Sequence, residues 1–261
     1  MFADTEDDFS LAPNSSAKAS TRLYVNTSPE HYVLEMDEPT GLEQLMWLAE
    51  TSQIEEAWVF VATKDSQGQE RYLWYEVGKK ETDGSVIIDS DALEKVASLY
   101  GNKIQAVHHY HIHPKSPPPG ITETIESWSL PSKEDWDDSE ELTAPFRAAS
   151  PSATFADLVV LTDGVWWLDR NGTASIDVTR ESAKLLACKN AVLDPTIHPS
   201  TEMAELVEQA RQGNDFGKSI PERARQAYLS CASGTSLQPK YYWEEQLASI
   251  PPIIRPNNED E

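Results

Sequence analysis

The chain has 261 residues, of which 39% are hydrophobic and 25% are charged, which allows one sizeable core with polar extensions. Its formal net charge of -23 excludes free nucleic acid and anionic membranes as partners, because both would be repelled, but it does not exclude basic surfaces or metal ions. No apolar stretch is long enough to span a bilayer, and the acidic start has no basic segment of the kind found in signal peptides.

Cys188 and Cys231 are the two cysteines of the chain. Their number and spacing indicate neither a disulfide framework nor a zinc knuckle. We therefore expect reduced thiols and a cytoplasmic protein.

The first part of the chain predicts a tail, two short strands and a helix. Residues 1–20 are acidic and then rich in Ser, Ala and Asn, without an apolar period, so we expect them to be disordered. Strands are predicted near 23–25 and 31–34. A helix capped by Thr40 follows, with apolar residues at helical spacing: Leu42, Leu45, Met46 and Ala49.

Strands dominate the middle of the chain. Residues 54–63 are apolar in their centre, which is typical of a strand buried on both faces. Further strands are predicted at 71–78 and 85–88, then a helix at 91–100. A strand at 104–110 leads into the tetrapeptide HIHP.

The second half begins with a proline-rich loop, 115–131, in which regular structure is not expected. A short acidic helix at 132–141 and two strands at 155–162 and 165–169 follow. Asp163 and Gly164 between these strands are a strong hairpin signal. One more strand is considered at 174–178.

Helical patterns replace the strands after residue 178, at 179–192, 201–212 and 219–232. The order of elements predicts an α/β (α+β) fold with a central mixed β-sheet flanked by helices and an all-α C-terminal extension. The expected organisation is a tail at 1–20, a catalytic domain at 21–185, a helical extension at 186–250 and a tail at 251–261.

Histidines concentrate at the end of the strand 104–110, where four of the six in the chain fall within six residues. His111 and His113 are separated by one residue, so both imidazoles point to the same face of a strand and can converge on one ion. His109 shares this face and His108 points the other way. Zinc favours such imidazole ligands, but an HxH pair alone also occurs on surface strands and at incidental metal sites.

Ser132 and Asp135 form a second pattern, S-x-x-D, at the start of the acidic helix. Ser at a helix start with an acid three residues later is a capping box, which begins many helices that do no chemistry. A helix start also fixes both side chains in space, so Asp135 could point at a metal instead of at its own backbone. Both interpretations stay open.

Together, HIHP and S-x-x-D resemble the motif of the JAMM (MPN+) zinc metalloproteases over about residues 23–180. The resemblance implies a cytidine-deaminase-like fold and a zinc ion held by His111, His113 and Asp135. It also implies that Ser132 donates to the developing oxyanion and that an upstream Glu is the general base. Glu55 matches that position best, and Glu56 is the alternative, since a shift of one residue exchanges the two strand faces.

The chain also departs from the family pattern. Lys115 to Pro131 form a longer spacer than in typical members, which could be a lid, a recognition loop or a sign that the S-x-x-D match is accidental. Trp58 and Ala62 replace the glycines of the Glu-bearing strand. Trp128 and Trp136 flank the expected site and are candidates for core packing or substrate contact.

The resemblance implies a zinc-dependent isopeptidase or peptidase that acts on a ubiquitin-like protein or peptide conjugate. The alternative is a non-catalytic MPN-like scaffold that binds protein partners. A third class, amidohydrolases with an HxH pair, would need a barrel with more strand–helix units than precede His111. The C-terminal helices could dock on the catalytic domain, form a dimer or recruit a partner.

Overall fold

The computed structural model describes residues 33–79, 87–115, 125–171, 176–193 and 220–250. The expected tails at 1–20 and 251–261, the strand at 23–25 and the helix at 201–212 lie outside these ranges. Within them, no helix has both the length and the apolar character needed to cross a membrane.

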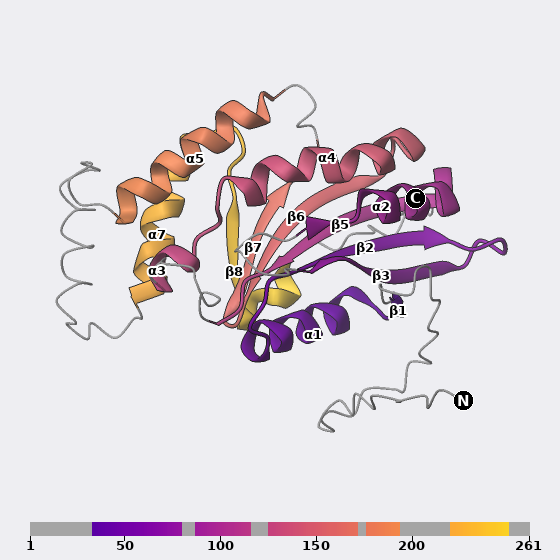
Figure 1. The fold of residues 1–261 in the computed structure, drawn as a ribbon, viewed down its shortest axis with the longest axis horizontal. Helices are drawn as coiled ribbons and strands as arrows, with labels where there is room; N and C mark the ends of the chain where they lie inside the picture. The colour runs from indigo at the N-terminus through magenta and orange to yellow at the C-terminus, as the bar shows by residue number, and fades with distance from the viewer. Residues whose placement is uncertain (1–32, 80–86, 116–124, 172–175, 194–219, 251–261) are drawn as a thin grey trace, which may run out of the picture.

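A mixed sheet of eight strands forms the centre of the described structure (Figure 1). The strands follow the order β1-β3-β2-β5-β6-β7-β8, with β4 paired to β3. Only β5 and β6 are parallel among these pairs. The bounds are β1 (Val33–Glu35), β2 (Glu56–Lys64), β3 (Glu70–Lys79), β4 (Ile87–Ile88), β5 (Ile104–Ile112), β6 (Thr154–Leu161), β7 (Gly164–Asp169) and β8 (Lys240–Trp243).

Helices cover both faces of the sheet, as the sequence predicts (Figure 1). α1 (Glu38–Thr51) lies on one face, while α2 (Ser90–Tyr100) and α4 (Glu134–Ala149) lie on the other. α3 (Ile125–Trp128), α5 (Val178–Leu193) and α7 (Ile220–Ala232) gather beside β6 and β7. Two short 3-10 helices, η1 (Gly101–Lys103) and η3 (Glu244–Ser249), complete the described elements.

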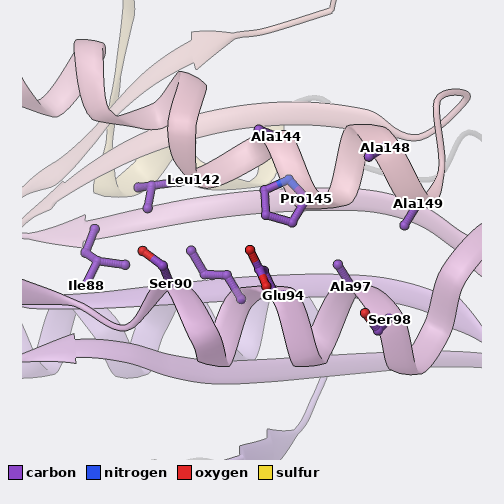
Figure 2. Close-up of a pocket in the computed structure, with 11 residues that line it drawn as sticks. Ile88, Ser90, Glu94, Ala97, Ser98, Leu142, Ala144, Pro145, Ala148 and Ala149 are labelled. Carbon is purple, nitrogen blue, oxygen red and sulfur yellow. The ribbon is translucent and has the colours of Figure 1, made fainter.

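The two faces of β2 supply separate cores, which confirms that this strand is buried on both sides. Trp58 and Phe60 pack toward α1, whereas Val59 and Val61 pack toward α2 and α4. Between α2 and α4 lies a groove of about 950 Å³ (Figure 2). Small side chains on both helices, such as Ala97 and Ala148, leave this space open.

Two helices differ from their predicted bounds, and a third, α3, lies in the spacer 115–131, where no regular structure was expected. α1 begins earlier because Asp37, not Thr40, is its N-cap and accepts a hydrogen bond from the Thr40 amide at 2.8 Å. α4 continues through Pro145 to Ala149, because Leu142 and Phe146 pack its second half into the core above the sheet. The end of α4 is thus fixed by packing, which outweighs the helix-breaking tendency of Pro145.

The C-terminal segment contains a strand and so differs from the all-α extension that we expected. β8 pairs antiparallel with β7, with Tyr242 opposite Val165. The expected boundary at 185/186 falls inside α5. Of the expected strand at 174–178, residues 174 and 175 lie outside the described ranges, 176 and 177 form no strand, and Val178 begins α5. Leu185 of α5 packs in one cluster with Val159 of β6. The described part of the C-terminal segment therefore completes the sheet and its core.

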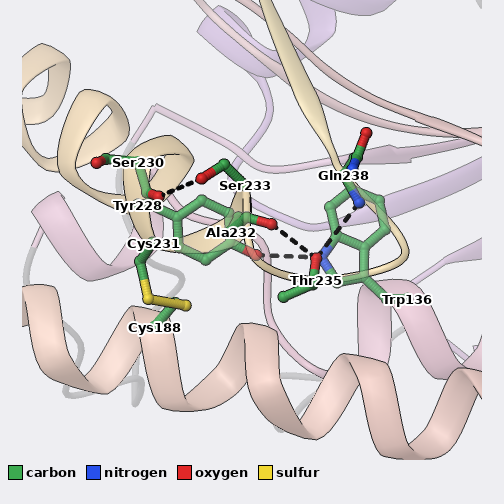
Figure 3. The surroundings of a disulfide bond; sticks show 9 residues. All are labelled: Trp136, Cys188, Tyr228, Ser230, Cys231, Ala232, Ser233, Thr235 and Gln238. Atoms are coloured by element: carbon green, nitrogen blue, oxygen red, sulfur yellow. Dashed lines mark hydrogen bonds between the residues drawn. A yellow bond between two sulfur atoms is a disulfide. The ribbon is translucent and has the colours of Figure 1, made fainter.

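Cys188 on α5 and Cys231 on α7 form a disulfide, which differs from the reduced thiols that we expected (Figure 3). The two helices pack side by side and bring the Cα atoms of the pair to 5.7 Å, within the range that a disulfide requires. No sequence signal reports this proximity, because the cysteines are 43 residues apart. The cytoplasmic location stays a prediction.

Opening this disulfide is expected to lower the free energy of unfolding by about 4 kcal/mol, because a loop of 43 residues is no longer closed in the unfolded chain. Denaturant unfolding with and without a thiol reductant measures the difference. The double variant Cys188→Ser, Cys231→Ser should match the reduced protein and ignore the reductant. Equal stability with and without reductant in the unsubstituted protein would contradict this expectation.

Candidate metal centre

Three potential ligands meet where β5 ends and β2 begins. Ala57, near the start of β2, lies opposite His111 on β5, which brings the preceding Glu55 toward the histidines. His113 follows β5, and its amide continues the pairing with β6 by donating to the Val160 carbonyl at 3.0 Å. The ligand atoms of Glu55, His111 and His113 lie within 4.8 Å of one another. This group could hold a metal ion.

The two ring nitrogens of His111 have different surroundings. Nδ1 hydrogen-bonds to Oδ1 of Asp135, and Nε2 lies 3.4 Å from Oε2 of Glu55. Among the described residues, Nε2 has no hydrogen-bond partner although it is buried. Buried polar atoms normally have a partner, and a metal ion would supply one for this nitrogen.

His113 is fixed by Trp128 of α3. Nδ1 of His113 donates to the Trp128 carbonyl at 3.0 Å, and the two rings stack with centroids 4.6 Å apart. The indole of Trp128 donates in turn to the Pro114 carbonyl at 2.6 Å. Metal-binding histidines commonly donate their second N–H in this way, which leaves Nε2 free to bind the ion. The long spacer thus contributes a supporting residue.

Asp135 lies in the first turn of α4 and contacts both the start of this helix and the two histidines. Its Oδ2 accepts from the Ser132 amide at 2.5 Å, while Ser132 Oγ accepts from the Asp135 amide at 3.1 Å. The same Oδ2 lies 3.5 Å from Nε2 of His113. Asp135 stands outside the three-residue group, so its role as a metal ligand stays a prediction.

The charges of the centre are strongly coupled. Burial opposes protonation of His111, but Asp135 and then Glu55 outweigh it and raise the pKa of His111 to about 10. Burial also opposes ionisation of Asp135, yet His111 and His113 hold its pKa well below the usual range. Without a cation, His111 and Asp135 therefore form an ion pair through Nδ1, and a metal ion bound at Nε2 would displace the proton of that nitrogen.

The two adjacent glutamates face opposite sides of the sheet. Glu56 accepts a hydrogen bond from Nε1 of Trp58 at 3.1 Å, on the face covered by α1. Glu55 lies on the face of His111 and is 3% exposed. Of the two candidates for the general base, Glu55 is thus the one beside the histidines.

The neighbouring histidines also divide between the faces, as strand periodicity predicts. His108 is buried toward α1 and its Nδ1 lies 2.7 Å from Oε1 of Glu38. His109 shares the face of His111, and its Nδ1 lies 3.8 Å from Oδ1 of Asp157. Trp136, a candidate for substrate contact, is fully buried.

Sequence reasoning missed two features around this centre. The Trp128 carbonyl is a backbone group, and no residue type signals its role. The Asp157–Arg170 ion pair was also missed, although an acid inside the apolar run of β6 is a detectable signal.

Comparisons with family models, curated proteins and solved structures found no match. The JAMM resemblance therefore stays a prediction. The functional argument depends on the geometry of the centre described above.

Proposed function

We propose that the chain is a zinc-dependent peptidase or isopeptidase of the JAMM type, which hydrolyses a peptide or isopeptide bond in a ubiquitin-like conjugate or precursor. The observation that carries this proposal is the buried Glu55–His111–His113 group with Asp135 bonded to His111. Its position at the end of β5, inside a mixed sheet flanked by helices, agrees with the order of elements that the resemblance implies.

The donor set fits zinc. Two imidazoles and a carboxylate are the ligands of many catalytic zinc sites, which keep one position for water. Nε2 of His111, which makes no well-aligned hydrogen bond, and the backbone-anchored His113 offer the two nitrogens. The His111 side chain is 18% exposed, whereas Glu55 and His113 are buried. Bound zinc would lower the pKa of water to about 7 and polarise the scissile carbonyl.

Glu55 supplies the proton transfers in this proposal. Its Oε2, 3.4 Å from Nε2 of His111, is placed beside the ion that this nitrogen would bind. A carboxylate there takes a proton from the attacking water and delivers it to the leaving amine. The hydroxyl of Ser132 accepts from the Asp135 amide, so its own proton is available for the tetrahedral oxyanion. Such a donor contributes about 3–4 kcal/mol in comparable sites.

Two ligand arrangements are compatible with this centre. In the first, which the family resemblance implies, Asp135 joins His111 and His113 as the third ligand and Glu55 is the base. In the second, Glu55 is the third ligand and Asp135 orients His111 through Nδ1. We propose the first arrangement, in which the Asp135 carboxylate would exchange its contact with His111 for the metal.

Hydrolysis of isopeptide-linked ubiquitin-like conjugates tests the function. We expect the zinc-loaded protein to release the modifier, a chelator to abolish the reaction and added zinc to restore it. His111→Gln should be inactive, whereas His108→Gln, at a buried histidine of the opposite face, is the matched control and should retain activity. If the zinc-loaded protein binds the conjugates without cutting them, the scaffold alternative replaces the proposal.

A further inference from the structure

A buried arginine, Arg170, bonds to α4 and to β6, the strand that pairs with the histidine-bearing strand β5. Arg170 follows β7 and its side chain is fully buried. Its Nε donates to Oδ2 of Asp157 on β6, and its Nη2 donates to the Trp136 carbonyl in the first turn of α4. The guanidinium therefore joins the sheet to the beginning of this helix.

Both ends of this bridge adjoin the metal centre. Trp136 is the residue after Asp135, so the bonded carbonyl belongs to the same helical turn as the carboxylate. Asp157 lies opposite His109 in the parallel pairing of β5 and β6, and His109 shares a strand face with His111. The bridge thus connects the strand pair that carries the histidines with the turn that carries Asp135.

The cost of burying two charges argues for a positional role. Replacing a buried ion pair with apolar residues of similar volume is often neutral or stabilising, so the pair is weak evidence for stability. Arg has a planar fork of donors, which can hold a carboxylate and a carbonyl in fixed directions together. An apolar side chain could make neither bond, and the rotating ammonium of a Lys would not fix both bonds in one planar fork.

We infer that Arg170 is a positioning residue of the metal centre, which fixes the first turn of α4 so that the Asp135 carboxylate meets His111. The part of this inference that concerns zinc binding rests on the proposed function. The geometry that it concerns, the bond between Nδ1 of His111 and Asp135, exists without metal. Supports of this kind change metal affinity about 10- to 100-fold when they are removed.

The test compares the apolar double variant Arg170→Met, Asp157→Leu with Arg147→Met. Arg147 is the matched control, because it also links α4 to the sheet region, through the Arg170 carbonyl at 3.3 Å and the Phe155 ring, but it lies far from the first turn. In metal-free protein, the far-downfield imidazole N–H resonance of His111 reports its bond to Asp135, and loss of the signal in Asp135→Asn assigns it. Zinc affinity is measured by chelator competition.

We expect the double variant to be folded, as cooperative unfolding in denaturant would show. It should lose the imidazole N–H resonance of His111 and bind zinc about 10- to 100-fold more weakly. Arg147→Met should keep the resonance and the affinity. A folded double variant that retains both would overturn the inference.

Arg170→Lys provides a second test if the double variant does not fold. Lys keeps the charge but cannot bond Asp157 and the Trp136 carbonyl in one fixed fork, so the resonance and the zinc affinity should both decrease. Unchanged values in this variant would overturn the inference. Failure of the unsubstituted protein to bind zinc would instead refute the proposed function, while the metal-free resonance would still test the role of Arg170.

Discussion

Glu55→Ala is expected to lower the rate of hydrolysis about 10²- to 10⁴-fold, while zinc stays bound at one ion per chain. The reason is that a general base contributes about this factor, whereas the metal in the proposed arrangement is held by His111, His113 and Asp135. Rate and metal content are measured on the same preparation, by single-turnover cleavage and by elemental analysis. A loss of rate without a loss of zinc separates a base from a ligand.

Glu56→Ala is the matched control for this experiment. It removes the adjacent carboxylate, which contacts Trp58 on the opposite face of the sheet, so rate and zinc content should stay close to those of the unsubstituted protein. If Glu55→Ala instead loses its zinc, Glu55 is a ligand and the second arrangement holds. If Glu55→Ala keeps both zinc and full activity, Glu55 is not the base.

Zinc affinity is expected to weaken by at least about tenfold for each pH unit on the acidic side, or by at least about 1000-fold from pH 9 to pH 6, because zinc-bound water with a pKa of about 7 would add to the effect above that pH. The pKa of His111 lies at about 10 in the metal-free centre, so the imidazole is protonated throughout this interval. Nε2 must lose its proton to bind zinc. Each bound ion therefore displaces one proton, and lowering the pH favours the competing proton.

Chelator competition across this interval measures the slope, and calorimetry in buffers of different protonation enthalpy counts the released proton. Asp135→Asn removes the main charge that raises the pKa of His111. The zinc affinity of this variant should therefore change less with pH near pH 9 than the affinity of the unsubstituted protein does. A dissociation constant of the unsubstituted protein that does not change between pH 6 and pH 9 would contradict the proposed ion pair.

The sequence predicts the features of this fold that local patterns specify. The apolar run of β2 and the helical periods of α2 and α5 are present at nearly the expected bounds. The hairpin is also present, but its two turn residues are Thr162 and Asp163, and Gly164 already pairs in β7. The shared face of His111 and His113 follows from strand alternation alone. These features need no knowledge of which segments meet in space.

Features that depend on distant segments were not predictable in this way. β8 is short and half-buried, so its identity as a strand comes from pairing with β7. The disulfide depends on how α5 packs on α7, and the Arg170 bridge depends on where α4 begins relative to the sheet. Propensity and periodicity carry no information on such contacts, which tertiary packing decides.

The chemistry of the centre was predictable only in part, because some of its features follow from local patterns and others depend on distant segments. The spacing of HIHP implies a ligand pair, and the structure adds a buried Nε2 on His111 that faces Glu55 and a carbonyl that anchors His113. The S-x-x-D pattern allows both a helix cap and a ligand, and the structure shows Asp135 in contact with the Ser132 amide and with both histidines.

The central claim is that His111 and His113 hold zinc, and X-ray absorption at the zinc edge, on protein purified without chelator, tests it most directly. The account predicts about one zinc per chain, with two imidazole nitrogens and carboxylate oxygen at about 2.0–2.2 Å, and loss of this spectrum in His111→Gln. A protein that binds no zinc, or zinc whose spectrum is the same in His111→Gln, would contradict it.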